Sequence, residues 1–144
     1  MEAFAKYFLL EEFLASKTAR DNKIDNSPSW EVVNNLHELA QFLDGLREKW
    51  GSGIRVSSGF RCEKLNKAVN GAPTSLHQKG FAADLQPVNG KFEEFKKCVI
   101  EWIKDKDFDQ CILEKNGKGV YWIHIGLYNN AGKQRKYIFS MNVK

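Results

Sequence analysis

Two short stretches of the chain carry side chains that can bind a metal ion. Residues 75–84 contain a histidine and an aspartate, and residues 122–125 contain a second histidine. His77, Asp84 and His124 offer two imidazoles and one carboxylate, which is the ligand set of zinc sites that keep one coordination position open for water. An open position is typical of a catalytic zinc rather than of a structural one.

The spacing of these residues is compatible with one site. Gly80 and two alanines lie between His77 and Asp84, so a tight turn can lead from the histidine into a short apolar strand near the carboxylate. His124 lies in residues 120–127, a run rich in β-branched and aromatic residues that predicts a strand. A single strand histidine is more often a core residue, and a single aspartate is often a turn former, so the prediction depends on the combination. Iron and manganese accept the same ligand set.

The motifs around these residues point to a known family. Residues 57–61 read S-S-G-F-R, residues 65–66 read L-N, residues 75–84 read S-L-H-Q-K-G-F-A-A-D, and residues 122–124 read W-I-H. With these motifs the chain resembles the zinc D-Ala-D-Ala carboxypeptidases and related cell-wall peptidases of the M15 type, whose fold is shared with the signalling domain of Hedgehog proteins. The resemblance extends from residues 7–13 to the strand of His124. It favours zinc and implies that His77, Asp84 and His124 are its ligands.

The resemblance also implies roles for residues outside the metal set. Arg61 matches the arginine that faces the substrate carbonyl or carboxylate in this family, whereas the plainer interpretation is a solvated surface charge or an ion pair with a local carboxylate. Ser75 is expected to hydrogen-bond a ligand or the substrate, with stabilisation of the turn as the equal alternative. Trp122 is expected to contribute to a substrate-binding surface, although strand aromatics usually pack in the core.

The general base departs from the pattern of the family. Many relatives have an acidic residue three positions before the last histidine, where this chain has Tyr121. Glu114 is joined to the strand of His124 by the turn at residues 115–119, so a hairpin can return its carboxylate to the histidine. Hedgehog domains and some peptidase relatives have an acidic residue at a similar place, which favours Glu114. Asp109 is the second choice, and the plain alternative for Glu114 is an exposed carboxylate at the end of a strand.

These residues predict hydrolysis of a peptide bond by metal-activated water. A zinc ion in such a site lowers the pKa of bound water to about 7, from about 15.7 in bulk. Glu114 would take the proton and pass it to the leaving amine, while Arg61 would pair with the oxyanion or the substrate carboxylate. The resemblance implies stem or cross-bridge peptides of peptidoglycan as substrates, cleaved by carboxypeptidase or endopeptidase action. The alternative is a non-catalytic zinc-containing domain that binds cell-wall peptides, because Tyr121 is compatible with loss of the base.

The rest of the sequence predicts the elements that position these residues. Ser27 and Pro28 are expected to be the N-cap and first residue of a long helix that ends before Gly51, with His37 beside its apolar stripe. Further helices are expected at residues 4–14, 63–69 and 92–103, and strands at 54–57, 111–113, 121–127 and 137–141. Because the connections are short, the strands are expected to be antiparallel. We therefore predict an α+β domain of the Hedgehog/DD-peptidase type, a small antiparallel sheet with helices packed on one side.

Composition completes these predictions. A chain of 144 residues with 42% hydrophobic content predicts one domain over residues 1–144, and we expect a monomer. Cys62, Cys98 and Cys111 lack C-x-x-C spacing and are expected to be buried free thiols. No signal peptide or membrane span is recognisable, so we expect synthesis in the cytoplasm and no membrane partner. The protein would then reach the cell wall by a phage-type lysis route, or act on wall fragments inside the cell. A net charge of +4 with scattered lysines suits anionic wall polymers and argues against a nucleic-acid partner.

Overall fold

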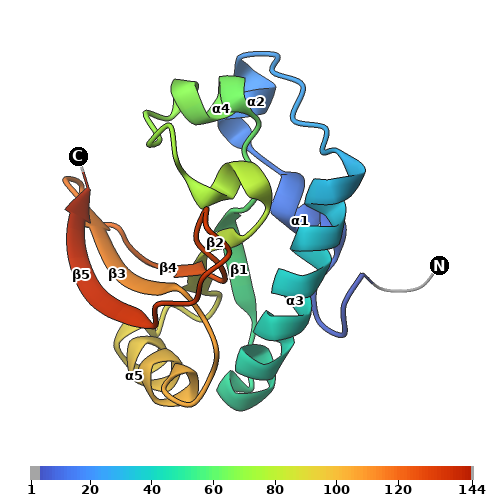
Figure 1. Ribbon diagram of the computed structural model, residues 1–144. Helices are drawn as coiled ribbons and strands as arrows, with labels where there is room; N and C mark the ends of the chain where they lie inside the picture. Colours follow the sequence, from blue (N-terminus) through green and yellow to red (C-terminus); the bar gives the residue numbers. More distant parts are fainter. Residues whose placement is uncertain (1–3, 144) are drawn as a thin grey trace.

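The computed structural model describes residues 4–143 and shows a mixed α+β fold around one five-stranded sheet (Figure 1). The strands lie in the order β1-β2-β4-β3-β5. Their bounds are β1 Ile54–Ser58, β2 Ala82–Pro87, β3 Gln110–Asn116, β4 Tyr121–Gly126 and β5 Tyr137–Val143. The helices are α1 Leu10–Leu14, α2 Lys17–Asp21, α3 Trp30–Trp50, α4 Glu63–Ala68, the 3₁₀ helix η1 Leu76–Lys79 and α5 Phe92–Ile103. The predicted α+β class is confirmed.

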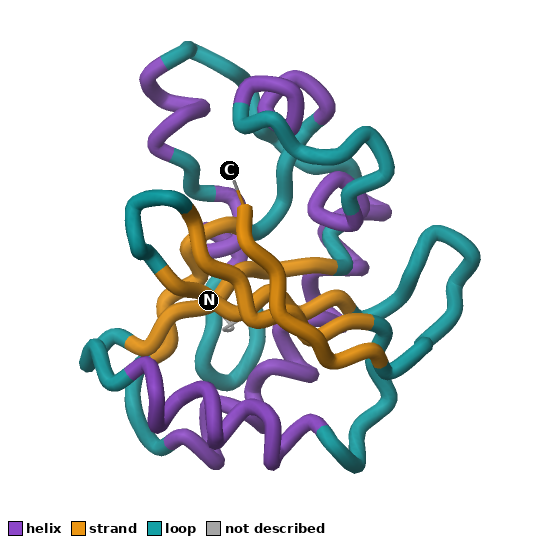
Figure 2. The backbone as a smooth tube through the Cα atoms, turned by 90° about the vertical axis from the view of Figure 1, so that its left-hand side faces the viewer, coloured by secondary structure: helices purple, strands orange, loops and turns teal. Residues whose placement is uncertain are grey.

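The two faces of the sheet differ in what they carry. Side chains of a strand alternate between faces, and one set packs in the core with α3 and α5: Ala83, Leu85, Cys111, Ile123 and Ile125. The alternate residues of the same strands, among them Asp84, Glu114 and His124, point to the opposite face. Figure 2 shows the strands crossing the molecule between the long helices and a layer of loops and short helices. The predicted packing of helices on one side therefore holds for α3 and α5, and the other face is available for a site.

Helix α3 begins later than the sequence predicted. Ser29, rather than Ser27, is the N-cap, and its hydroxyl accepts a hydrogen bond from the backbone N–H of Val32 at 3.2 Å. Ser27 is engaged differently, since its backbone N–H donates to the carboxylate of Asp25. The predicted end is confirmed, because Gly51 caps the helix in the left-handed conformation with a φ of 73°. The apolar stripe is also as predicted, with four leucines fully buried: Leu36, Leu39, Leu43 and Leu46.

The amino-terminal segment is helical only from Leu10, so the prediction of a helix from residue 4 was wrong. The backbone N–H groups of Lys6 and Tyr7 donate to the side chain of Asp44 on α3, at 2.9 and 3.0 Å. These long-range hydrogen bonds replace those that a helix would make. The segment still covers the core, since Phe8 is buried there.

The prediction that all strands are antiparallel was wrong for β5. The pairs β1–β2, β2–β4 and β3–β4 are antiparallel, but β5 pairs with β3 in parallel, from Gln110 opposite Tyr137 to Asn116 opposite Val143. The end of β4 lies beside the start of β3, and residues 127–136 lead from there to the start of β5 on the other side of β3. There the fully buried carboxylate of Asp109 accepts two hydrogen bonds from the guanidinium of Arg135, at 2.7 and 2.8 Å. This ion pair lies where the start of β5 meets the start of β3, and the two strands then run in the same direction.

The cysteines are only partly as predicted. All three are free thiols, but only Cys111 is buried, while Cys62 and Cys98 are half-buried. The sulfur of Cys62 caps α4 by accepting a hydrogen bond from the backbone N–H of Leu65. Within residues 4–143, no helix is both long and apolar enough to cross a bilayer.

Candidate active site

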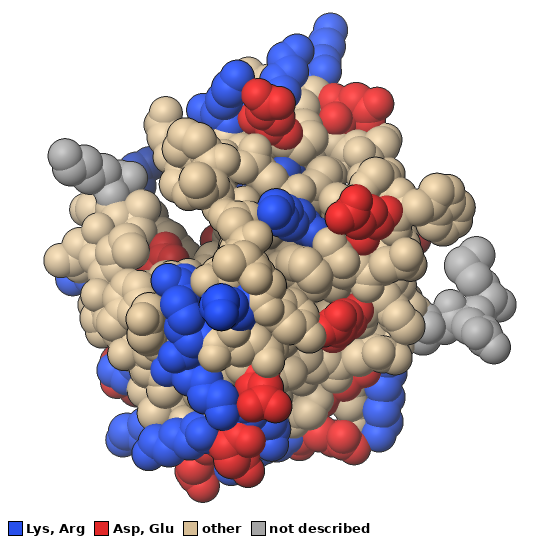
Figure 3. All heavy atoms as spheres, viewed as in Figure 1, with Lys and Arg blue, Asp and Glu red and all other residues tan. Residues whose placement is uncertain are grey.

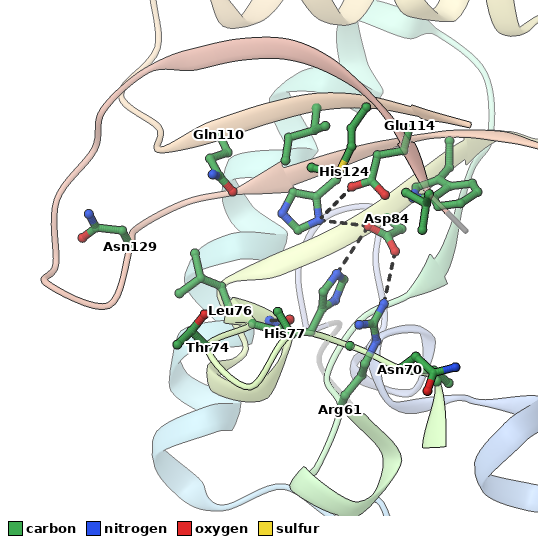
Figure 4. A pocket seen from close by; sticks show the side chains of 18 of the residues that line it. Arg61, Asn70, Thr74, Leu76, His77, Asp84, Gln110, Glu114, His124 and Asn129 are labelled. Atoms are coloured by element: carbon green, nitrogen blue, oxygen red, sulfur yellow. Dashed lines mark hydrogen bonds and ion pairs between the residues drawn. The ribbon is translucent and has the colours of Figure 1, made fainter. Parts of the chain in front are cut away.

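The side chains of His77, Asp84 and His124 meet on the open face of the sheet (Figure 4). Asp84 on β2 and His124 on β4 are direct partners in the antiparallel pair, so their side chains lie next to each other on the same face. His77 comes from η1, which ends at Gly80 with a φ of 80°. This glycine is the tight turn that the sequence predicted, and a Cβ atom there would lie 2.9 Å from the carbonyl oxygen of Val32. Close packing on α3 therefore requires glycine at this position.

The separations of the three side chains suit a zinc ion. The Oδ1 atom of Asp84 lies 3.3 Å from Nε2 of His77 and 3.1 Å from Nδ1 of His124. Zinc–ligand bonds of about 2.0–2.1 Å in a tetrahedron place neighbouring ligand atoms roughly 3.3 Å apart. All three ligand atoms lie within 4.8 Å of one another, so one ion can reach them together.

The hydrogen bond of His77 leaves one ring nitrogen free for a metal. Its Nδ1–H donates to the backbone carbonyl of Gly59 at 2.7 Å, and Nε2 then presents a lone pair toward Asp84. The nitrogen and the carboxylate oxygen are both acceptors, and a metal cation is a partner that both can bind. Burial lowers the pKa of His77 despite the opposing charge of Asp84, so the ring is neutral near pH 7. The neutral imidazole is the form that binds metal.

Asp84 is held in its charged form inside the protein. Burial opposes its ionisation, but the interactions with His77 and His124 outweigh burial and keep the pKa of Asp84 well below its usual range. Its second oxygen, Oδ2, lies 3.4 Å from the guanidinium of Arg61. One carboxylate oxygen is thus directed at the histidines and the other at a permanent positive charge.

Arg61 is largely buried in the site, so its interpretation as a solvated surface charge is wrong, whereas the alternative of an ion pair with a nearby carboxylate agrees with its contact to Asp84. Its Nε–H donates to the hydroxyl of Ser58 at 3.0 Å, and Nη1 donates to the side-chain oxygen of Asn66 at 3.4 Å. Together with the contact to Asp84, these bonds fix the plane of the guanidinium. Burial lowers the pKa of Arg61, while the charges of Asp84 and Glu114 raise it. The side chain lines the cleft and remains a cation at physiological pH.

Asn66 supports Arg61, a role that the sequence did not reveal. It is only 2% exposed, and its Nδ2 donates to the backbone carbonyl of Ala72 at 2.8 Å. A Cβ atom on Gly71 would lie 2.0 Å from Oδ1 of Asn66, so glycine is required there as well. The L-N motif at residues 65–66 was the only sequence signal for this residue, and it carried no chemistry by itself.

Glu114 lies beside the metal-binding group. Within the β3–β4 hairpin it is the partner of Trp122, and its Oε1 lies 3.9 Å from Nδ1 of His124. The side chain is largely buried in the cleft, unlike an exposed strand-end carboxylate. Burial and the negative charge of Asp84 raise the pKa of Glu114, with partial compensation from His124, Trp122 and Arg61. A carboxylate with a raised pKa, next to the metal-binding group, has the properties of a general base.

Asp109, the second choice for the base, serves a different purpose. Its carboxylate is fully buried in the ion pair with Arg135 and does not line the cleft. Tyr121 also takes no part in the cleft lining, since its ring packs 5.4 Å from the ring of Phe92. His37 lies on an exposed part of α3, with its ring 5.2 Å from that of Phe4.

Ser75 and Trp122 both line the cleft. The hydroxyl of Ser75 accepts a hydrogen bond from the backbone N–H of His77 at 3.3 Å, so it caps η1 and stabilises the turn that presents the histidine. The indole of Trp122 comes from the residue directly opposite Glu114 in the strand pair, and its N–H lowers the pKa of that carboxylate.

The cleft around these residues has a volume of about 590 Å³. Its floor is the sheet, one wall is the loop region 61–77, and the other wall is β5. Figure 3 shows this region as a hollow with acidic atoms inside it. A cleft of this size accommodates a short peptide above the metal-binding group.

Comparison with known proteins agrees with this geometry. The family model of peptidase M15 matches residues 6–126, which include all three metal-binding side chains, Arg61 and Glu114. A search of curated proteins found no match. Members of the matched family are zinc-dependent peptidases, and the donor set of this site fits zinc. The chain therefore belongs to the peptidase M15 family.

Proposed function

We propose that the protein is a zinc-dependent peptidase that hydrolyses stem or cross-bridge peptides of peptidoglycan. The observation that carries the proposal is the convergence of His77, Asp84 and His124 with the carboxylate of Glu114 3.9 Å from His124. A binding domain needs no base at this position. The cleft-facing placement of Glu114 therefore favours an enzyme over a non-catalytic domain.

Each side chain has a distinct task in this proposal. His77, Asp84 and His124 would hold the zinc ion, which would supply a Lewis acid that lowers the pKa of bound water. Glu114 accepts the proton of the attacking water as the new carbon–oxygen bond forms. It then returns the proton to the amine nitrogen as the carbon–nitrogen bond breaks, and its raised pKa assists that return.

Arg61 provides positive charge for the substrate. Its orientation is fixed by Ser58, Asn66 and Asp84, so no reorganisation is needed when an anionic group enters the cleft. A terminal carboxylate of the peptide, or the oxyanion that develops during attack, suits this guanidinium. Trp122 lines the cleft beside Glu114 and offers its indole ring as a further contact for the bound peptide.

The experiment that tests the proposal is mass spectrometry of purified peptidoglycan fragments after incubation with the zinc-loaded protein. We expect new stem-peptide or cross-bridge products whose masses identify the cleaved bond. A chelator-treated sample and Glu114→Gln protein serve as controls, and both should leave the fragments intact. If protein shown to contain zinc cleaves no fragment from several wall types, the non-catalytic binding domain becomes the better explanation.

A further inference from the structure

The carboxy-terminal strand β5 forms a wall of the cleft that lies outside the family match. The match ends at residue 126, whereas β5 covers Tyr137–Val143. Three of its side chains, Phe139, Met141 and Val143, line the same cleft as the metal-binding residues. All three are apolar, in contrast to the polar and charged groups at the centre of the cleft.

The strand register places this wall close to the catalytic groups. Asp84 pairs with His124, His124 with Ile112, and Ile112 with Phe139, so these residues form one row across the sheet. In the next row Trp122 pairs with Glu114, and Glu114 pairs with Met141. The proposed base therefore has the apolar wall as its direct neighbour.

Two apolar residues of this wall are exposed to solvent and can be covered by a bound partner. The exposed fractions of Phe139 and Met141 are 37% and 44%, although both are large apolar side chains. The strand lies at the edge of the sheet and pairs only with β3 among the described strands. Clefts that bind small molecules and peptides combine apolar surface with a few polar groups, and this cleft has that composition.

We propose that the cleft face of β5 is a subsite for an apolar side chain of the peptide substrate. This inference builds on the proposed peptidase function and adds a specificity element to it. The occupant is the substrate because the wall is continuous with the candidate active site through the paired residues Glu114 and Met141.

The distance across the sheet indicates which residue of the substrate occupies the subsite. His124 and Phe139 are two strands apart, which corresponds to about 10 Å at roughly 4.8 Å per strand. An extended peptide advances about 3.3 Å per residue. The apolar side chain therefore belongs to a residue about three positions from the scissile bond.

The strand itself provides a matched control. Ile138 is 40% exposed, similar to Phe139, but it pairs with Cys111 and points to the opposite face of the sheet. Substitution of either residue by serine perturbs the same edge strand to a similar degree. Only the substitution at Phe139 changes the cleft.

The test compares two N-acetylated peptides that end in D-Ala-D-Ala and differ only in the third residue before the scissile bond, leucine or glycine. We expect the unaltered zinc-loaded protein to prefer leucine by about tenfold in kcat/KM. Phe139→Ser and Met141→Ser should reduce this preference to about twofold or less, whereas Ile138→Ser should preserve it. Zinc content should be the same in all variants.

The possible results distinguish failure of the proposed subsite from failure of the proposed peptidase function. If the unaltered protein is active but cleaves both peptides equally well, the subsite is overturned and the peptidase function stands. If it cleaves neither peptide nor any wall fragment, the proposed function fails and the subsite fails with it. Sedimentation of the unaltered protein adds a third comparison. A dimer that dissociates in both the Phe139→Ser and Ile138→Ser variants would assign the strand edge to a second copy of the chain and overturn the subsite.

Discussion

The Oε1 atom of Glu114 lies 3.9 Å from Nδ1 of His124, because the β3–β4 hairpin folds the glutamate back onto the strand that carries the histidine. The resemblance to the M15 type led us to expect an acidic residue three positions before the last histidine, as in many relatives, where this chain has Tyr121. Tyr121 lies outside the cleft lining, and Glu114 lies within it. A carboxylate from the neighbouring strand thus lies beside His124, where the proposed mechanism has its base.

The first prediction concerns Glu114 as the base. Glu114→Gln keeps the shape of the side chain but removes its ability to accept a proton. We expect kcat to fall by about 10²–10⁴-fold, while bound zinc stays near one equivalent per chain. Peptide hydrolysis assays and metal analysis of the same samples measure the two quantities.

Glu94→Gln, an exposed change in the first turn of α5, is the control for this experiment and should leave hydrolysis unchanged. Near-normal hydrolysis by the Glu114→Gln protein would falsify the assignment of the base. Loss of zinc in that protein would instead make Glu114 a ligand.

The second prediction concerns the metal. Asp84→Asn preserves the size of the side chain but removes the charge that both histidines and Arg61 face. Loss of a group that only supports a metal ligand lowers metal affinity by roughly 10–100-fold. Because Asp84 is a proposed ligand itself, we expect the zinc affinity of the Asp84→Asn protein to fall by more than this. Competition with a chromophoric chelator gives the dissociation constants. Asp21→Asn, on the exposed helix α2, should bind zinc as the unaltered protein does, and equal affinity of the Asp84→Asn protein would remove Asp84 from the ligand set.

The third prediction concerns the geometry of Arg61. Its three hydrogen bonds use the planar fork of the guanidinium, which a lysine cannot reproduce. We expect Arg61→Lys to reduce kcat/KM by about 10²-fold, close to the effect of losing one oxyanion-stabilising donor, with zinc affinity changed much less. Arg55→Lys, on the exposed side of β1, is the matched control. A fully active Arg61→Lys protein would show that charge alone is sufficient.

Local sequence patterns predicted those helices, turns and strands whose structure is determined by residues close to them in the sequence. The apolar spacing of residues 92–103 predicted α5 with both ends as observed, and Gly51 predicted the end of α3. The types and spacing of the two histidines and Asp84 predicted that they would meet at one site, since each adjoins a recognisable turn or strand. In these cases the residues that determine the structure lie within a few positions of the element itself.

Features that depend on distant partners were not predictable in this way. The parallel direction of β5 depends on contacts between distant residues at its start, among them the ion pair between Asp109 and Arg135, and no local sequence pattern predicts that pair. The non-helical conformation before Leu10 depends on Asp44, which accepts hydrogen bonds from the segment across a long stretch of chain. The support of Arg61 by Asn66 likewise appears only when the loop at Gly71 closes against it.

The fourth prediction concerns the acid sensitivity of the metal-free protein. Burial lowers the pKa of His77 in the folded state below the ordinary value of 6.5. Below about pH 6.5 the unfolded chain therefore binds a proton that the folded protein does not, so the free energy of unfolding decreases as the pH falls. One such group contributes a slope of at most about 1.4 kcal/mol per pH unit. Asp84, whose pKa is also lowered, adds to the loss only below its ordinary value of 3.8.

Urea unfolding of chelator-treated protein between about pH 7.5 and about pH 5 measures this slope. His77→Asn introduces a side chain that does not titrate in this range, so we expect the slope to decrease even though the variant is less stable overall. His37→Asn removes an exposed histidine of α3 and should retain the slope of the unaltered protein. If the His77→Asn protein keeps the full slope, the acid sensitivity arises elsewhere and burial of a neutral His77 does not control it. If the slope disappears, the imidazole of His77, a candidate metal ligand, is also the group that makes the metal-free protein sensitive to acid.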